Sequence, residues 1–238
     1  MLLMKMNWWT RLLDFISPRE CVVCDRRLTA SERSLCTVCL LHVPRTNYHL
    51  DAYNNPMNRL FWGLAEVERA TAYFHYEPHS ELARLIYALK YRQRPDIGED
   101  MGRLMAHELM TSGFFEGIDV LLPVPLSRKR LRQRGYNQSE MLARGISEVT
   151  HLPVVTNALR REYFRQSQTA LGRRERQENV EGVFVQKRAA RLVGQHVLLV
   201  DDVCTTGATL LACIKALKDV DNIRISVVTL GLTKKSGK

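Results

Sequence analysis

Apolar and polar positions along the chain follow two different periods. Val67 to Tyr76, Ile118 to Val124 and Val197 to Val200 predict strands. The last is a continuous apolar run, which is typical of a strand buried on both faces of a parallel sheet. Glu81 to Tyr91 and Ile97 to Thr111 instead repeat apolar residues at helical spacing. Strands that alternate with helices predict an α/β fold, with a mostly parallel sheet flanked by helices.

The third predicted strand runs directly into polar residues. The sequence VLLVDDVCTTGAT, Val197 to Thr209, places Asp201 and Asp202 after the apolar run and a Thr/Gly turn before the next helix. Backbone N–H groups of such a turn, together with the N-terminal end of the helix, bind phosphate. Two carboxylates beside a phosphate are favourable only when a neutral polyol lies between them. A ribose meets this requirement, because its 2′ and 3′ hydroxyls can donate to the carboxylates.

This motif resembles the PRPP-binding signature of type I phosphoribosyltransferases, where PRPP is phosphoribosyl pyrophosphate. The resemblance implies a Rossmann-like type I phosphoribosyltransferase fold, in which Asp201 and Asp202 bind the ribose. It also implies that the 5′-phosphate is bound by the residues of the turn, which are Thr205, Thr206, Gly207, Ala208 and Thr209. The alternative is an ordinary strand–turn–helix corner, in which Thr205 or Thr206 caps the helix and the aspartates form a solvated turn.

The second apolar strand ends in a basic segment. Pro125 stops the strand, a basic turn follows, and Gly135 to Asn137 lead into a helix. A donor-rich loop at the carboxyl end of a parallel strand is a suitable place for a pyrophosphate opposite the ribose. We expect this pyrophosphate loop to contain Leu126, Ser127, Arg128, Lys129, Arg130 and Arg134, with Mg²⁺ bound to the pyrophosphate oxygens.

Positive charge is concentrated in one part of the chain. The 238 residues carry a formal net charge of +10, and the window from Ser127 to Glu178 holds 12 Lys or Arg against five Glu. Such a field indicates a polyanionic partner, which is either pyrophosphate or a nucleic-acid backbone. Within this region, Arg160 to Phe184 has two interpretations. It is either a flap that closes over the site and excludes water or a surface helix with Glu175 and Glu178 paired to arginines.

The cysteines form two CxxC pairs, CVVC and CTVC, separated by eleven residues. Two such turns supply the four thiolates that tetrahedral zinc accepts, so we expect a structural zinc ion bound by Cys21, Cys24, Cys36 and Cys39. With four protein ligands, no position is left for an activated water. Cys213 is expected to pack in the core. Cys204 is either a thiolate stabilised by the helix N-terminus or an inert small side chain.

The N-terminus is too short and too often interrupted by charge to span a bilayer, and the chain is expected to be cytoplasmic. Residues 1–20 predict an amphipathic helix, with Trp8, Leu12, Phe15 and Ile16 on one face; it either docks on the protein or lies on a membrane surface. Residues 21–45 are expected to form a zinc ribbon, 46–60 a linker, and 61–238 the phosphoribosyltransferase domain.

The motifs in this order resemble the ComF family, the competence protein F group related to GntX. The marks are the CVVC and CTVC pairs, LKY at 89–91, PVPL at 123–126, RGYNQ at 134–138, QTALGRRER, NVEGVF and VLLVDDVCTTGAT. The resemblance spans residues 18–232 and implies single-stranded DNA and competence proteins as partners. Thr205 stands where hypoxanthine-guanine salvage enzymes carry an acid that assists at the purine, so the acceptor and the catalytic residue stay unassigned.

Two functions are therefore open. One is phosphoribosyl transfer, in which a nucleophile attacks the anomeric carbon of PRPP through an oxocarbenium-like transition state while arginines and Mg²⁺ stabilise the leaving pyrophosphate. The other is a non-catalytic role in handling single-stranded DNA during uptake and recombination. Aromatic side chains among the basic residues would distinguish the two functions, because bases stack on them. The basic window has only Tyr136, Tyr163 and Phe164, which is compatible with either function.

Overall fold

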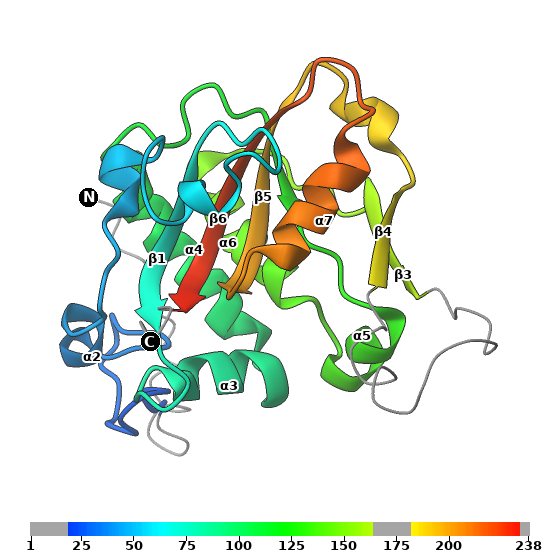
Figure 1. Cartoon of the computed structure of the whole chain (residues 1–238). Coiled ribbons are helices and arrows are strands. Elements are labelled where there is room, and N and C mark those ends of the chain that lie inside the picture. The colour runs from blue at the N-terminus through cyan, green and yellow to red at the C-terminus, as the bar shows by residue number, and fades with distance from the viewer. Residues whose placement is uncertain (1–18, 164–181, 234–238) are drawn as a thin grey trace, which may run out of the picture.

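A computed structural model describes residues 19–163 and 182–233. Its centre is a four-stranded parallel sheet in the order β1-β6-β5-β2. The strands are β1 (Ala70–Tyr76), β2 (Val120–Pro123), β5 (His196–Cys204) and β6 (Arg224–Thr233). Figure 1 labels β1, β6 and β5, which lie side by side. In β5, residues 197–200 are fully buried, because helices cover both faces of the sheet. The α/β architecture predicted from the hydrophobic pattern is confirmed.

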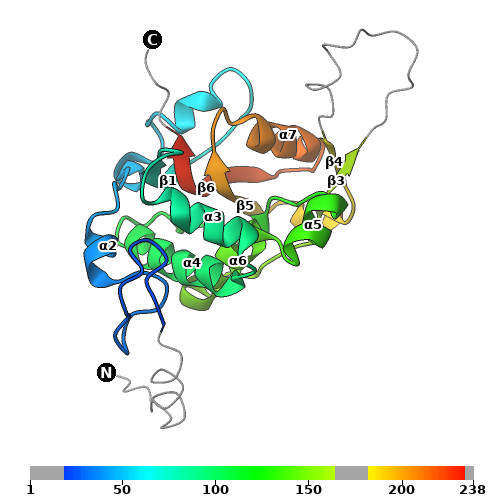
Figure 2. The same ribbon diagram turned by 90° about the horizontal axis from the view of Figure 1, so that it is seen from below.

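The helices lie in two layers. Figure 2 shows α3 (Ala83–Tyr91), α4 (Pro95–Met110) and α6 (Gln138–Thr150) on one face of the sheet and α7 (Ala208–Leu217) on the other. Each layer buries its own apolar cluster against alternating residues of the strands. Helices α4 and α6 pack backbone to backbone, since a Cβ added at Gly145 would lie 2.0 Å from the carbonyl oxygen of Glu99.

The basic segment predicted as a loop is instead a short helix, α5 (Arg128–Arg134). The Ser127 hydroxyl accepts a hydrogen bond from the backbone N–H of Arg130 at 3.2 Å and caps the N-terminus. Gly135 ends the helix in the left-handed conformation, with φ of 80°. Arg, Lys, Leu and Gln are good helix formers, so the cap signals and the composition of this segment both favour the helix.

The segment from Arg160 to Phe184 begins and ends in strands. Strand β3 (Leu159–Tyr163) pairs antiparallel with β4 (Gly182–Gln186) in a separate two-stranded sheet. A surface helix is therefore wrong for the two ends of this segment. Residues 164–181, and with them most of the predicted flap, lie outside the described residues, as do residues 1–18 of the predicted N-terminal helix.

Residues 46–60, predicted as a linker, pack against the outer strand β1. They contain two short 3₁₀ helices, η1 (Tyr48–Asp51) and η2 (Asn58–Leu60). The backbone N–H of Thr46 donates to the Tyr73 carbonyl at 3.2 Å, and that of Ala70 donates to the Ala52 carbonyl at 2.9 Å. Met57 is fully buried and belongs to the apolar cluster that includes residues of α7. This segment thus contributes to the core rather than spacing two domains apart.

The remaining elements are α2 (Thr37–Leu41), which has Cys36 of the second cysteine pair as its N-cap residue and contains Cys39, and η3 (Ala189–Leu192), which precedes β5. Among the described residues, no helix is long and apolar enough to cross a membrane.

Candidate functional site

The four parallel strands all end at one edge of the sheet, which faces down in Figure 1 and toward the reader in Figure 2. The acidic pair lies at this edge, inside β5 rather than after it. Asp201 stands opposite Thr229, and Cys204 opposite Leu232, in the parallel ladder with β6. The pairing of β5 with β6 continues past the apolar run of β5, because β6 is ten residues long and supplies backbone partners as far as Cys204. Both carboxylates are therefore fixed on a rigid element.

Asp201 is almost completely buried. Its Oδ1 accepts hydrogen bonds from the Ser139 hydroxyl and from the backbone N–H of Asp202, each at 2.9 Å. Burial raises the pKa of Asp201 to about 7, and the adjacent charge of Asp202 acts in the same direction. The side chain is thus a carboxyl group that changes protonation near neutral pH.

Asp202 forms an ion pair with a residue from a distant helix. The Lys90 ammonium at the last turn of α3 lies 3.0 Å from Asp202 Oδ2. Helix α3 lies just beyond the carboxyl ends of the strands in Figure 1, and its last turn therefore reaches the acidic pair. Lys90 lies in the LKY motif, but the sequence alone does not predict its ion pair with Asp202, because α3 and β5 come together only in the folded chain.

A cavity of about 160 Å³ joins the acidic pair to the basic helix. Arg130 and Arg134 of α5 line it from one side, and Asp201 and Asp202 from the other. The other lining residues are Lys90, Val124, Pro125, Leu126, Ser139, Arg161, Val203 and Thr209. Of the predicted pyrophosphate residues, Leu126, Arg130 and Arg134 line this cavity. Ser127, Arg128 and Lys129 do not, since Ser127 is buried as the cap of α5 and the other two are exposed.

Several polar groups around this cavity have unused hydrogen-bonding capacity. Arg161 Nε and Gln138 Nε2 are buried and have no hydrogen-bond partner in the part of the chain that the structure describes. Arg134 donates to Gln138 Oε1 at 2.8 Å and lies over the Tyr91 ring at 5.3 Å. Buried polar groups usually have partners; of these two residues, Arg161 lines the cavity and Gln138 does not.

The Thr/Gly turn joins β5 to α7 and leaves its polar groups accessible. Gly207 is the N-cap residue of α7 and has φ of 81°, a conformation that favours glycine. The Thr206 hydroxyl accepts only a long hydrogen bond, 3.4 Å, from the backbone N–H of Ala208. Thr205, Thr206 and Ala208 are exposed. Thus neither threonine is the N-cap residue of α7, and the N-terminal end of this helix lies where β5 ends.

The two isolated cysteines are buried. Cys204, the last residue of β5, is 2% exposed, and burial raises its pKa to about 12. Cys213 on α7 is fully buried and its pKa is raised for the same reason. A thiol in this state is a poor nucleophile. Of the two interpretations of Cys204, the inert side chain is the one that fits.

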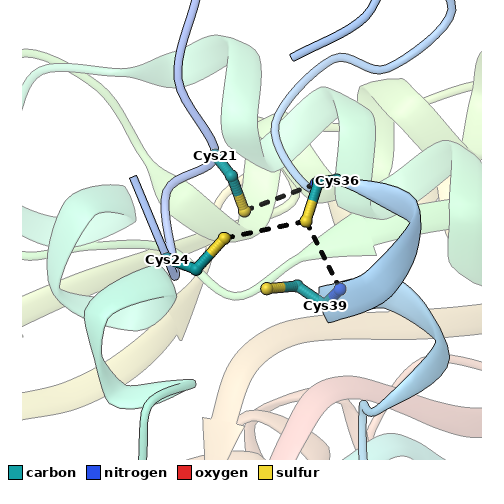
Figure 3. Close-up of side chains that lie close together, drawn as sticks. All are labelled: Cys21, Cys24, Cys36 and Cys39. Carbon is teal, nitrogen blue, oxygen red and sulfur yellow. Dashed lines mark hydrogen bonds between the residues drawn. The ribbon is translucent and has the colours of Figure 1, made fainter. Parts of the chain in front are cut away.

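The four N-terminal cysteines converge on one point. All four sulfur atoms lie within 4.8 Å of one another, and Figure 3 shows them facing a common centre. Cys24 Sγ is 3.7 Å from Cys36 Sγ, close to the spacing of about 3.8 Å that tetrahedral zinc with bonds of about 2.3 Å requires. Burial opposes ionisation of Cys21, but backbone hydrogen bonds outweigh it and lower its pKa to about 7. This cluster could hold a zinc ion.

The cysteine module packs on α3, which reaches the site, and on the neighbouring helix α4. Arg84 of α3 donates to the Val23 carbonyl and to the Asp25 carboxylate, each at 2.7 Å. The Ser34 hydroxyl donates to Asp100 of α4. Apolar residues of the module, with the buried cysteines, share one core cluster with α3 and α4. The module therefore supports the helix that carries Lys90.

The sheet topology and the acidic edge are those of a phosphoribosyltransferase fold, and residues 138–238 match the family model described as phosphoribosyl transferase domain. The DNA utilization protein YhgH of Escherichia coli K12 is 31% identical over 192 residues, which is 79% of each chain. Competence protein F of Haemophilus influenzae is 26% identical over 229 residues, 91% of this chain and 97% of that protein. Competence protein ComFC of Bacillus subtilis is 32% identical over 93 residues, 38% of this chain and 35% of that protein. The chain belongs to this ComF family, and it has the expected parallel sheet and N-terminal cysteine cluster.

Proposed function

We propose that this protein binds PRPP, or a related ribose 5-phosphate ligand, at the carboxyl edge of the sheet and transfers its phosphoribosyl group to an acceptor. The observation that carries the proposal is the cavity in which Asp201 and Asp202 face Arg130 and Arg134. An acidic wall suits neutral hydroxyl donors, and a basic wall suits an anion. PRPP carries both kinds of group on one ring.

Each part of the ligand has a matching group. Asp201 and Asp202 would accept hydrogen bonds from the ribose hydroxyls, and the turn from Thr205 to Thr209 would bind the 5′-phosphate with backbone N–H groups. Arg130, Arg134, Arg161 and Lys90 would bind the pyrophosphate. The carboxylates are hard oxygen donors of the kind that Mg²⁺ takes, and the ion would neutralise charge on the pyrophosphate.

In the transfer step, the bond between the anomeric carbon and the pyrophosphate oxygen breaks, and its electron pair leaves with pyrophosphate. The ring carbon becomes oxocarbenium-like, and a lone pair of the acceptor forms the new bond. The arginines and Lys90 would stabilise the negative charge that develops on the leaving group, which is where preorganised cations are most effective. The acceptor then releases its proton.

Isothermal titration with PRPP and with ribose 5-phosphate tests this proposal. Each lost charged hydrogen bond costs about 1.5–3 kcal/mol, so Asp201→Asn with Asp202→Asn should abolish measurable binding of both ligands. The matched control is Asp219→Asn with Asp221→Asn, which removes two exposed carboxylates at the opposite edge of the sheet. Undiminished affinity in a folded Asp201/Asp202 variant would refute the ribose site.

A second candidate function, binding of single-stranded DNA, is favoured by an aromatic surface on α3. Tyr87 and Tyr91 are 55% and 61% exposed, and their ring centres lie 5.0 Å apart. Together with Arg92 they line a groove of about 440 Å³, and Arg134 lies over Tyr91. Exposed tyrosines beside arginines suit base stacking and phosphate pairing. YhgH is described as a DNA utilization protein, which agrees with this role.

Oligonucleotide binding across a salt series tests the second function. Base–aromatic stacking contributes about 1–3 kcal/mol per base, so Tyr87→Ala with Tyr91→Ala should weaken binding of a poly-dT 20-mer by tenfold or more. Tyr53→Ala is the matched control, because Tyr53 is also 61% exposed but does not line the groove. Equal affinity in all three proteins would exclude this surface.

A further inference from the structure

A wide groove lies at the amino edge of the sheet, which faces up in Figure 1 and is opposite to the edge that carries the acidic pair. Its volume is about 1160 Å³. One wall is the loop of residues 62–68, which leads into β1, and the other consists of the end of α7 and the start of β6. Cavities for small molecules measure about 300–1,000 Å³, so the groove is wide enough for a protein surface.

The loop wall presents apolar side chains that are exposed but fixed. Trp62 and Leu64 are 58% and 56% exposed. The indole Nε1 of Trp62 donates to Oδ1 of the buried Asn58 at 2.7 Å. The backbone N–H groups of Leu64 and Ala65 both donate to the carbonyl of the buried Phe61, at 2.9 and 3.0 Å. Because the loop is already ordered, little conformational freedom is left to lose on association, and tryptophan is enriched in protein interfaces.

The two walls of the groove carry opposite charges. Where they meet, Glu68 Oε2 lies 3.8 Å from a guanidinium nitrogen of Arg224. Farther out, Glu66 on the loop and Lys215 and Lys218 at the end of α7 line the groove, are exposed and form no ion pair within the described ranges. A groove of one sign would select a partner of the opposite sign. A groove with one sign on each wall is instead complementary to a copy of itself.

We propose that this groove is the interface of a symmetric homodimer, in which the loop of each copy inserts into the groove of the other. A two-fold axis through the groove places the acidic wall of one copy opposite the basic wall of the second. Glu66 then pairs with Lys215 and Lys218 of the second copy, twice in each dimer, and the exposed apolar surface of Trp62 and Leu64 is buried. Both carboxyl edges face away from this interface and stay open to ligands. The inference does not depend on the proposed function.

Sedimentation equilibrium of the full chain over a concentration series tests the interface. The wild type should have twice the mass of one chain at high concentration and dissociate on dilution. Trp62→Ser with Leu64→Ser should weaken the dimer a hundredfold or more, because tryptophan is frequent among the residues that dominate binding and each substitution occurs twice. The control is Leu50→Ser with Tyr53→Ser, which changes two apolar side chains that are 71% and 61% exposed outside the groove and should leave the dimer unchanged. All four side chains are exposed, so both variants should fold.

Charge reversal tests how the two walls meet. Glu66→Lys should weaken the dimer tenfold or more, and Lys215→Glu with Lys218→Glu should do the same, because like charges then face each other at both contacts of the two-fold interface. A mixture of these two variants should associate again as a dimer with one copy of each, since opposite charges meet at both contacts. A mixture that stays monomeric would contradict this pairing.

Carbodiimide coupling, which joins a carboxylate to an amine, identifies the occupant of the groove. In a mixture of unlabelled and isotope-labelled protein, a Glu66 peptide coupled to a Lys215 or Lys218 peptide should contain one labelled and one unlabelled partner, because the contact joins two copies. Coupling of these groups to Lys5 or Asp14 would instead place the N-terminal segment of the chain in the groove and overturn the dimer. A wild type that stays monomeric at every concentration, or a dimer that the loop variant does not weaken, would also overturn the inference.

Discussion

The Lys90 ammonium lies 3.0 Å from the Asp202 carboxylate, so an ion pair joins α3 to the acidic pair of β5. Less than two turns earlier on the same helix, Arg84 bonds the Val23 carbonyl and the Asp25 carboxylate of the cysteine module. One helix therefore contacts both the module and the candidate site. A change in the module is expected to reach the acidic pair through the position of α3.

Replacing Lys90 with Met should weaken PRPP binding by tenfold or more. The ammonium lines the cavity with Arg130 and Arg134, and one hydrogen bond to a charged group contributes about 1.5–3 kcal/mol. Ribose 5-phosphate lacks the pyrophosphate and should lose less affinity. Calorimetric titration of both ligands measures the difference. The control is Lys215→Met, which replaces an exposed lysine of α7 outside the cavity. This variant should bind both ligands as tightly as the wild type does. Equal losses for the two ligands would contradict a pyrophosphate role for Lys90.

Ligand affinity should rise with pH through neutrality. The raised pKa of Asp201, about 7, means that the carboxyl is protonated below this pH in the unliganded protein and ionised above it. The ionised form accepts hydrogen bonds from both ribose hydroxyls, so binding should release a proton and strengthen from pH 6.5 to 8.5. Affinity for ribose 5-phosphate, measured at each pH, checks this.

The 5′-phosphate of the ligand also titrates, with a second pKa of about 6, so a control has to separate its effect from that of Asp201. Asp201→Asn removes the carboxyl but leaves the phosphate, so any residual binding of this variant should change little above pH 7. Wild-type affinity that is constant between pH 6.5 and 8.5 would contradict proton release from Asp201 on ligand binding in this range.

The parts of the site that could be predicted are those that are contiguous in sequence. The apolar run, Asp201, Asp202 and the Thr/Gly turn follow one another, and so do the cysteines of each CxxC pair. Lys90 and Arg161 reach the same cavity from α3 and β3, and no local pattern places them there, because their position depends on how distant elements pack. Such contacts are visible only in the fold.

The helical state of α5 is a different case, because its signals were present in the sequence. Ser127 and Gly135 bracket a run of good helix formers, which is the ordinary pattern of a capped helix. The loop interpretation gave more weight to charge than to these caps. Residues 46–60 were not expected to pack in the core, because Asn54, Asn55 and Pro56 indicate turns. In the structure, however, the Asn55 amide donates to the Ala70 carbonyl at 2.8 Å and fixes the segment to β1.

The protein should contain one zinc ion per chain. Elemental analysis after purification without chelator measures it, and Cys24→Ser with Cys39→Ser should remove the metal. Because the module shares a core cluster with α3 and α4, we expect a loss of at least about 2 kcal/mol, or a fall in Tm of about 4–8 °C for a chain of this size. PRPP affinity should fall as well, through the contact of Arg84.

Cys213→Ala is the control for the zinc prediction, since this buried cysteine lies on α7 and outside the cluster. It should retain one zinc ion. A wild-type protein without metal, in which the four thiols of the module react freely with a thiol reagent, would rule out the zinc site. A variant that loses zinc but keeps both its Tm and its PRPP affinity would refute the structural link through α3.

The two faces of α5 should differ in their effect on ligands. Arg130 and Arg134 line the cavity, whereas Arg128 and Lys129 of the same helix are exposed and do not. Arg130→Gln with Arg134→Gln should weaken PRPP binding at least a hundredfold, because each charged hydrogen bond contributes about 1.5–3 kcal/mol. The affinity for ribose 5-phosphate should fall far less, because only PRPP carries the second anion. Arg128→Gln with Lys129→Gln removes the same charge and should leave both affinities unchanged.

The same two double variants distinguish a pyrophosphate site from a nucleic-acid face. For a single-stranded oligonucleotide, each lost phosphate contact lowers the slope of log affinity against log salt by about 0.7. If Arg130 and Arg134 serve pyrophosphate, their replacement should change this slope no more than replacement of Arg128 and Lys129 does. Two results together would instead assign these arginines to DNA: equal losses of affinity for PRPP and ribose 5-phosphate, and a salt slope that flattens only in the Arg130/Arg134 variant. A cavity that recognised pyrophosphate would lose more affinity for PRPP than for ribose 5-phosphate.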